Sequence, residues 1–252
     1  MPKIPRKSSA VSLVTGAALG IGAGIAELFA QHGAHVYVLD IDEAGAQAKA
    51  AQINAAGGSA HALKCDVSNR ADCEAAINAA IARYGHIDSL INNAGIYPRR
   101  LFLETTEADW DRMQAVNVKS LMHLCQLALP HMIARRSGKI VNISSVTVWI
   151  GVEKLVHYVT SKGAVLGFTR SLAREMGRHN IHINAVTPGA IKTEGEDVHA
   201  NADDIRAIVA DQCLDRRILP ADVAAACLFL ASPLSDGMTG QTLNVDGGLY
   251  LH

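Results

Sequence analysis

The sequence lacks a large net charge and a long apolar run, and each absence excludes a class of protein. Its 252 residues carry 23 Lys and Arg against 24 Asp and Glu, a formal net charge of -1. This balance gives no electrostatic attraction for nucleic acid or an anionic membrane, so neither is expected as a partner. The longest apolar stretches fall well short of the roughly 18 residues that a membrane span needs. The basic start is followed by no apolar signal-peptide core, so we expect residues 1–9 to be a loose tail.

Cysteines are few and show no pairing pattern. The five, at positions 65, 73, 125, 213 and 227, include no Cys-x-x-Cys and are odd in number. A disulfide framework is therefore not expected, and this usage fits a reducing cytoplasm. His179 and His182 have a spacing that can bind metal, but they straddle an expected helix end and strand start. We expect no metal site.

What the sequence does contain is a regular alternation of strand and helix patterns. Apolar residues make up 49% and charged residues 19%, as in a compact enzyme with a substantial core. Short β-branched runs alternate with longer Ala-rich segments of helical period. The expected strands are 11–15, 35–40, 60–64, 89–92, 139–143, 182–186 and 242–245. The expected helices are 21–32, 43–56, 69–84, 107–136, 156–178 and 220–232.

This alternation predicts an α/β fold, a doubly wound parallel sheet of about seven strands with helices on both faces. Nothing resembles a linker or a repeat, so residues 10–252 are expected to form a single Rossmann-type domain. Glycines punctuate the expected helix ends as C-terminal caps should, at Gly33, Gly57, Gly58, Gly85 and Gly138. Thr106 with Asp109 is a plausible start for the fourth helix. The polar, acidic segment 190–214 interrupts the alternation and is either a lid over a ligand or an ordinary surface loop.

A glycine-rich turn follows the first expected strand. Residues 15–22 are Thr-Gly-Ala-Ala-Leu-Gly-Ile-Gly, and a helix is expected next. Glycines permit a tight turn there, and the helix N-terminus offers its N–H groups to a pyrophosphate. The spacing, Gly-x3-Gly-x-Gly, differs from the usual Gly-x-Gly-x-x-Gly of dinucleotide sites. The expected phosphate-binding residues are Gly16, Leu19, Gly20, Ile21 and Gly22.

Asp40 ends the second expected strand, eighteen residues after Gly22. A carboxylate at this place hydrogen-bonds the ribose 2′-hydroxyl of NAD and repels the 2′-phosphate of NADP. Residues 17–19 contain no Lys or Arg that could offset that repulsion. We therefore expect NAD, with Ile41 beside Asp40 in the same site. The alternative, an aspartate that caps the next helix, suits Asp42 better.

The segment from Ser145 to Lys162 can hold a proton-transfer device. Of the five tyrosines, Tyr158 alone has a lysine four residues later, Lys162, so the two share a helix face. A nearby ammonium favours the phenolate, and bringing a tyrosine pKa from 10 to about 7 takes roughly 4 kcal/mol. Ser145, thirteen residues before Tyr158, ends a buried-strand pattern and could polarise a carbonyl. Taken alone, such a Tyr/Lys pair is far more often part of an exposed helix surface.

Together these motifs resemble those of the short-chain dehydrogenase/reductase family, over almost the whole of residues 11–248. The matching pieces occur in the family's order. They are residues 15–22, Asp40, Cys65-Asp66-Val67, Asn92-Asn93-Ala94-Gly95, Asn117, Ser145, Tyr158 with Lys162, Pro188-Gly189 with Thr193, and the ending 239–248.

The resemblance implies a role for each matching position. Tyr158 would be the general acid/base, and Lys162 would lower its pKa and bind the nicotinamide ribose. Ser145 would hold the substrate oxygen, with Ser144 as the alternative hydroxyl, and Asn117 would support a proton-carrying water chain. Asp66 and Val67 would contact the adenine. The channel and the nicotinamide would be lined by Asn93, Ala94, Gly95, Pro188, Gly189, Ile191 and Thr193, although residues 92–95 would also suit a plain strand-ending turn.

The resemblance thus implies an NAD-dependent oxidoreductase that interconverts a secondary alcohol and a ketone, in the cytoplasm and as a homotetramer. The alternatives are an NADP-linked ketoreductase of carrier-bound 3-oxoacyl groups and, less in keeping with the full catalytic set, a non-catalytic cofactor-bound regulator. Substrate identity lies in variable positions that mix apolar and polar side chains. Candidates for the pocket wall are Tyr97, Val146, Thr147, Trp149, Val152 and Glu153. They do not choose among simple alcohols, sugars, polyols and cyclic ketones.

Overall fold

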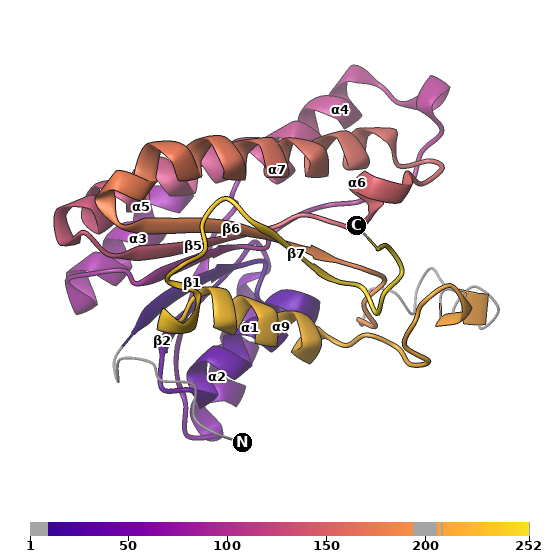
Figure 1. The fold of residues 1–252 in the computed structure, drawn as a ribbon. Helices are drawn as coiled ribbons and strands as arrows, with labels where there is room; N and C mark the ends of the chain where they lie inside the picture. The colour runs from indigo at the N-terminus through magenta and orange to yellow at the C-terminus, as the bar shows by residue number, and fades with distance from the viewer. Residues whose placement is uncertain (1–9, 194–205, 208, 252) are drawn as a thin grey trace.

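The computed structural model describes residues 10–193, 206–207 and 209–251 (Figure 1). The expected N-terminal tail, 1–9, lies outside the described residues, as does most of the expected lid at 190–214. Within the described ranges, no helix combines the length and the apolar character that crossing a membrane requires.

Seven parallel strands form one sheet in the order β3-β2-β1-β4-β5-β6-β7. The order reverses between β1 and β4, which is where doubly wound sheets bind their ligands. The expected α/β fold with about seven strands is confirmed. The strands are β1 Val11–Thr15, β2 His35–Asp40, β3 Ser59–Lys64, β4 Ser89–Asn92, β5 Gly138–Ile143, β6 Ile181–Pro188 and β7 Thr242–Val245.

Helices cover both faces of this sheet. α1, α2 and α9 lie on one face, and α3, α5 and α7 lie on the other (Figure 1). Their bounds are α1 Gly20–Gln31, α2 Glu43–Ala55, α3 Arg70–Tyr84, α4 Glu107–Gln114, α5 Ser120–Arg135, α6 Thr147–Ile150, α7 Val156–Met176 and α9 Pro220–Leu230. Short helical turns occur at η1 Phe102–Glu104, η2 Ala115–Lys119, η3 Gly177–His179 and η4 Pro233–Ser235.

The strands are buried on both faces because neighbouring residues point to opposite sides. In β1, Leu13 belongs to the apolar cluster under α3 and α5, whereas Val14 belongs to the cluster under α1 and α9. Phe29 of α1 is fully buried in the second cluster, and Met132 of α5 is fully buried in the first. The packing of helices against both faces of the sheet fixes the strand ends, where the loops of the site begin.

The expected helix 107–136 is in fact two α-helices joined by a π-helical turn. α4 begins with the predicted capping box, in which Thr106 and Asp109 bond each other's backbone N–H groups. The chain then widens into η2, a π-helix, before α5 continues to Arg135. A π-turn holds one residue more than an α-turn, and the 3.6-residue period does not reveal it. Its buried residue, Asn117, is one of the expected site residues.

One expected helix cap is wrong. Gly85 caps α3 in the left-handed region as predicted, with φ 74°. Gly138, however, is the first residue of β5, and Arg136 takes the left-handed cap position of α5, with φ 49°. A Cβ at Gly138 would lie 2.5 Å from Met132 Sδ, so glycine is needed there for close packing rather than for a cap.

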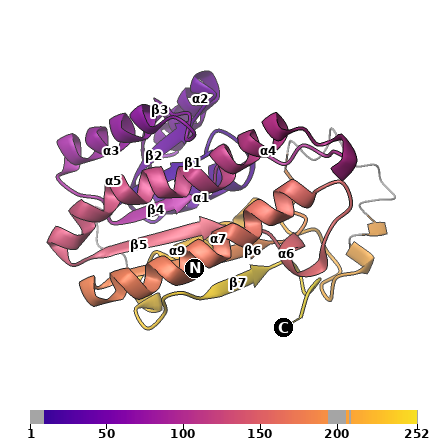
Figure 2. The same ribbon diagram turned by 90° about the horizontal axis from the view of Figure 1, so that it is seen from above.

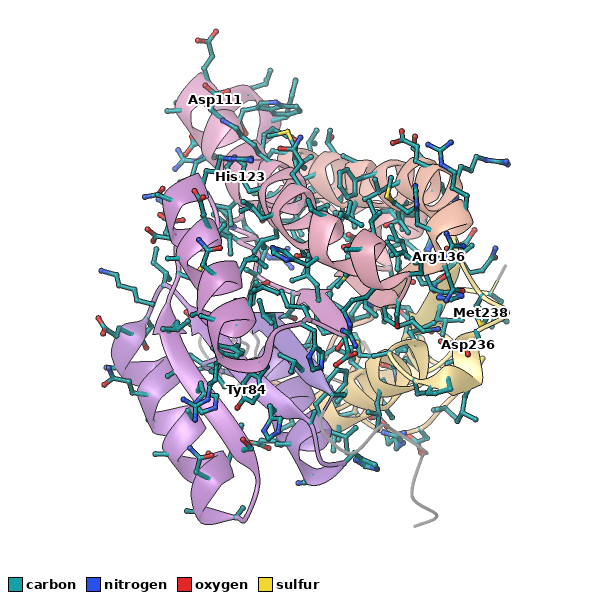
Figure 3. The ribbon with its side chains drawn as sticks, turned by 90° about the vertical axis from the view of Figure 1, so that its left-hand side faces the viewer. Tyr84, Asp111, His123, Arg136, Asp236 and Met238 are labelled. Carbon is teal, nitrogen blue, oxygen red and sulfur yellow. The ribbon has the colours of Figure 1, made fainter. Side chains whose placement is uncertain are left out.

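The carboxyl ends of the parallel strands meet at the edge near α6 and the C-terminus (Figure 2). The opposite edge carries the ends of α3 and α5 at Tyr84 and Arg136, together with Asp236 (Figure 3). None of these three residues was predicted for the site. The expected site residues lie instead at the carboxyl edge.

Candidate active site

The turns after β1 and β4 are tied together by hydrogen bonds. Thr15 Oγ1 accepts from the backbone N–H groups of Asn93 and Ala94, both at 3.0 Å. Asn93 Nδ2 in turn donates to the carbonyls of Thr15 and Gly16, both at 2.9 Å. The Asn93 side chain therefore holds the glycine-rich turn in place. Residues 92–95 thus do more than end a strand with a plain turn.

Close packing explains the glycines of this turn. A Cβ at Gly22 would lie 2.1 Å from the Gly16 carbonyl oxygen, and one at Gly16 would lie 2.8 Å from Ala94 Cα. Gly20 has φ +58°, and Thr193 Cγ2 lies 3.3 Å from its Cβ position. Leu19 is the N-cap of α1, and its side chain makes no capping hydrogen bond.

Asp40 lies beside this turn with both carboxylate oxygens engaged. Its Oδ2 accepts from Ala18 N at 2.9 Å and its Oδ1 from Asp42 N at 3.0 Å. The alternative role, capping of α2, belongs to Asp42, which accepts from Gly45 N at 3.1 Å. Leu19 and Ile41 are 60% and 63% exposed, so apolar surface adjoins the carboxylate.

The Cys65-Asp66-Val67 segment follows β3 next to Asp40. Cys65 N donates to the Asp40 carbonyl at 2.7 Å, and Asp66 Oδ1 accepts from the backbone and hydroxyl of Ser68. The Val67 carbonyl is the hydrogen-bond acceptor for His123 Nδ1 at 3.4 Å, from α5. His123 was not predicted from the sequence, because nothing in its spacing links α5 to this segment.

Tyr158, Lys162 and Ser145 come together from α7 and the end of β5. Ser145 lies near enough to the Tyr158 phenol to favour its ionised form, and Lys162 Nζ lies 5.7 Å from the centre of the Tyr158 ring. Lys162 Nζ also donates to the Ile143 carbonyl at 2.9 Å. The alternative hydroxyl, Ser144 Oγ, donates instead to the Lys162 carbonyl at 2.8 Å, so it fastens α7 to β5.

The expected lowering of the tyrosine pKa by the lysine is not seen. Burial raises the pKa of the Tyr158 phenol above its ordinary value of 10.0, and the nearby Ser145 hydroxyl opposes that rise. Burial also lowers the pKa of Lys162 to about 8, so the lysine is still mostly charged at neutral pH but gives up its proton more readily than a free lysine. In this geometry, Ser145 is the group that favours the phenolate.

Asn117 reaches the same region from the π-helical turn. Its Oδ1 accepts from Ile96 N at 2.9 Å, and its Nδ2 donates to the Ile96 carbonyl and to Ser161 Oγ, both at 3.0 Å. A Cβ at Gly95 would lie 3.3 Å from both Asn117 Oδ1 and Lys162 Nζ. Gly95 therefore lets the side chains of Asn117 and Lys162 come close to the backbone after β4.

The segment after β6 closes the far side of the site. Pro188 O accepts from Val146 N at 3.0 Å, and Gly189 N donates to Val245 O at 3.0 Å. A Cβ at Gly189 would lie 2.8 Å from Asp246 Cα. Ile191 is buried and forms a parallel bridge with Ile218.

The expected substrate-pocket residues differ in how close they lie to the catalytic group. Tyr97 packs edge-on to Tyr158, with 6.2 Å between ring centres, and Thr147 hydrogen-bonds Ser145. Trp149 instead stacks on Tyr250 at 5.8 Å. Val146 is buried, Val152 is partly buried and Glu153 is exposed.

Comparison with known proteins gives matches over nearly the whole chain. The family model described as enoyl-(acyl carrier protein) reductase matches residues 16–250. A probable galactose dehydrogenase of Rhizobium meliloti is 37% identical over 240 residues, 94% of each chain. A 3-oxoacyl-[acyl-carrier-protein] reductase of Chlamydia pneumoniae is 37% identical over 240 residues, 94% of this chain and 95% of the relative. A D-xylose 1-dehydrogenase of Caulobacter vibrioides is 37% identical over 236 residues, 94% of each chain.

The family model spans the Tyr158 and Lys162 segment and ends beyond β7, the last strand of the sheet. The chain belongs to the short-chain dehydrogenase/reductase family and is an oxidoreductase that acts on CH–OH groups.

Proposed function

We propose that this protein is an NAD-dependent dehydrogenase that interconverts a secondary alcohol and a ketone, with Tyr158 as the general acid/base. The observation that carries the proposal is the convergence of the Ser145 hydroxyl, the Tyr158 phenol and the Lys162 ammonium beside Asn117. All four side chains lie at the carboxyl edge, where a glycine cradle and a carboxylate also gather.

The residues of the cradle fit a dinucleotide. Gly16 and Gly22 leave no room for a Cβ, so the turn brings backbone N–H groups to the surface where a pyrophosphate would bind. Asp40 would accept from the ribose hydroxyls, while exposed Leu19 and Ile41 would pack against the adenosine. When bound, NAD would supply the hydride chemistry of the reaction.

The preference for NAD over NADP is assigned to Asp40. Its carboxylate is held between Ala18 N and Asp42 N, and an added 2′-phosphate would bring a charge of about -2 beside it. Residues 17–19 offer no cationic side chain that could compensate. Electrostatic repulsion therefore favours the cofactor without the phosphate.

The protein's own residues would move and hold the proton. In alcohol oxidation, the Tyr158 phenolate takes the hydroxyl proton while Ser145 donates a hydrogen bond to the same substrate oxygen. Lys162, with a pKa of about 8, can exchange a proton near neutral pH. Asn117 fixes the turn at Ile96 that borders Lys162. Tyr97 packs against the Tyr158 ring and helps to set its orientation.

A second candidate is reduction of carrier-bound 3-oxoacyl groups with NADPH, because one group of relatives carries that name. We disfavour it for this chain because of Asp40. The names of two other relatives make galactose and xylose reasonable test substrates. Assembly as a homotetramer through α5 and α7 remains a prediction from family resemblance.

The test is a panel of secondary alcohols, polyols, galactose and xylose with NAD or NADP, read by reduced-cofactor absorbance. An acetoacetyl thioester with NADH or NADPH covers the second candidate. Turnover with NAD that disappears in Tyr158→Phe supports the proposal. Turnover confined to NADPH and the thioester would transfer the assignment to the ketoreductase. A protein that binds NADH tightly but converts no member of the panel would instead be a cofactor-bound regulator.

A further inference from the structure

The Ser145 hydroxyl has more neighbours than its expected role requires. Ser145 favours the ionised form of the nearby Tyr158 phenol, and its Oγ also accepts from Thr147 N at 3.2 Å and from Thr147 Oγ1 at 3.0 Å. Both of these hydrogen bonds come from a single residue, two positions along the chain. Thr147 was expected in the pocket wall, as a possible partner for a substrate hydroxyl.

A count of donors and acceptors shows what these contacts do. A serine hydroxyl has one proton to donate and two lone pairs with which to accept. The two Thr147 donors occupy both lone pairs. Ser145 can then meet the phenol oxygen only as a donor, which is the polarity that favours a phenolate or a substrate oxygen carrying negative charge.

The surroundings of Thr147 hold it in place. It begins α6, and the preceding residue, Val146, is 3% exposed and donates its N–H to Pro188 O at 3.0 Å. Trp149 N donates to Val146 O at 3.0 Å and Gly151 N to Thr147 O at 2.9 Å, which closes the short helix. The Thr147 donors are thus anchored to the end of β6 rather than carried by a free loop.

We propose that Thr147 is a positioning residue, which holds Ser145 Oγ as a hydrogen-bond donor toward Tyr158 and the substrate oxygen. This inference rests on the proposed function for its chemistry, but its hydrogen bonds belong to the protein alone. The Thr147 hydroxyl proton is committed to Ser145, so a substrate hydroxyl meets the Thr147 oxygen only as a donor.

The role matters in both directions of the reaction. During ketone reduction, negative charge develops on the substrate oxygen, and a fixed donor stabilises it without reorienting. Before the alcohol binds for oxidation, the same donor stabilises the phenolate that must take the proton. Without the Thr147 hydroxyl, one Ser145 lone pair becomes open, and Ser145 can rotate to accept from the phenol instead.

The test compares Thr147→Val, which is nearly isosteric but lacks the hydroxyl, with Thr147→Ser, which keeps it. The matched control is Thr160→Val on α7, because the exposed Thr160, among the described residues, donates only to its own helix, at Val156 O, 2.8 Å away. The first readout needs no cofactor: ultraviolet titration of tyrosinate, taken as the difference between each variant and the same variant carrying Tyr158→Phe. The second is the pH profile of kcat and kcat/KM with the best substrate of the panel.

Thr147→Val is expected to raise the Tyr158 titration midpoint by roughly half to one pH unit and to lower kcat about five- to tenfold. Cofactor affinity should not change, Thr147→Ser should recover most of the loss, and Thr160→Val should match the parent. If valine disturbs folding, as judged by circular dichroism, Thr147→Ala gives the same comparison.

An unshifted titration in Thr147→Val overturns the inference, as does an equal loss of turnover in Thr147→Val and Thr147→Ser. A shifted titration in a protein whose parent oxidises no alcohol has a different meaning. It would refute the proposed function and leave the assignment of Thr147 standing.

Discussion

Lys162 is buried at 4% exposure, and its replacement by methionine should make the protein more stable while it stops the reaction. Methionine has nearly the same length and no charge, so Lys162→Met keeps the packing of α7 against β5. The change removes an ammonium group whose charge is disfavoured by burial. It also removes the hydrogen bond to the Ile143 carbonyl.

The size of the effect can be worked out from the lysine pKa. Burial lowers the pKa of Lys162 from 10.5 to about 8. A pKa difference of roughly 2.5 corresponds to about 3 kcal/mol, the cost at pH 7 of keeping the charge in the folded protein. Loss of the hydrogen bond to the Ile143 carbonyl costs about 1 kcal/mol. The net gain in unfolding free energy is therefore about 2 kcal/mol.

The gain should depend on pH in one direction. Below pH 8 the lysine is charged in both the folded and the unfolded parent, so the full penalty is present. Between pH 8 and 10.5 the unfolded chain binds more protons than the folded one, and parent stability rises with pH. The advantage of Lys162→Met should accordingly shrink across this window and vanish near its upper end.

Urea unfolding at pH 7 and pH 10, without added cofactor, measures this directly. Lys119→Met is the control, because Lys119 is exposed and its replacement should change stability by less than about 0.5 kcal/mol. A Lys162→Met protein less stable than the parent at pH 7, or a gain that is the same at both pH values, would refute the reasoning.

Four further outcomes are expected. Tyr158→Phe should lower kcat at least about a hundredfold and leave the NADH affinity, measured by fluorescence, within about threefold of the parent's. Turnover close to the parent's would rule out Tyr158 as the general acid/base. The parent should prefer NAD over NADP by at least about tenfold in kcat/KM, which is roughly 1.4 kcal/mol, and Asp40→Ala should reduce this NAD/NADP ratio. Steady-state kinetics in which Asp40→Ala leaves the ratio unchanged would contradict the role of Asp40. Gly22→Ala should abolish NADH binding, because the new Cβ meets the Gly16 carbonyl oxygen 2.1 Å away; normal titration of NADH would count against this packing. His157 is 1% exposed, and neither ring nitrogen has a hydrogen-bond partner among the described residues. His157→Leu should therefore raise the unfolding free energy by about 1 kcal/mol in urea melts. A loss of stability would mean that the imidazole has a hydrogen-bond partner after all.

The fold could be predicted from the sequence because burial on both faces leaves a plain pattern. Val36 and Val38 point to one apolar cluster while Tyr37 and Leu39 point to the other, so the whole run is apolar and typical of an interior strand. The turn after β1 was also predictable, because glycines are needed where an added Cβ would come within 3 Å of neighbouring backbone atoms. These signals are local in the sequence.

The features that could not be predicted depend on contacts between distant segments. The role of Thr147 needs the position of Ser145 relative to α6, and the contact of His123 with Val67 needs the packing of α5 beside α3. The expected pKa direction of Tyr158 was wrong because it rested on a neighbouring ammonium and omitted the burial of both groups. Desolvation is a property of the folded interior and has no signature in residue spacing.

The π-helical turn at Ala115–Lys119 makes the length of this segment as important as its composition. An α-helix bonds residue i to residue i+4, whereas a π-turn bonds residue i to residue i+5, so the turn takes up one extra residue while the helices on either side keep their buried faces. Deletion of one residue here would restore a regular helix and leave His123 at the Val67 carbonyl, with Leu124 and Met132 still facing the sheet. It would remove the widened turn from which Asn117 bonds Ile96 and Ser161. The segment that presents Asn117 thus tolerates substitution of its exposed residues far better than loss of any one of them.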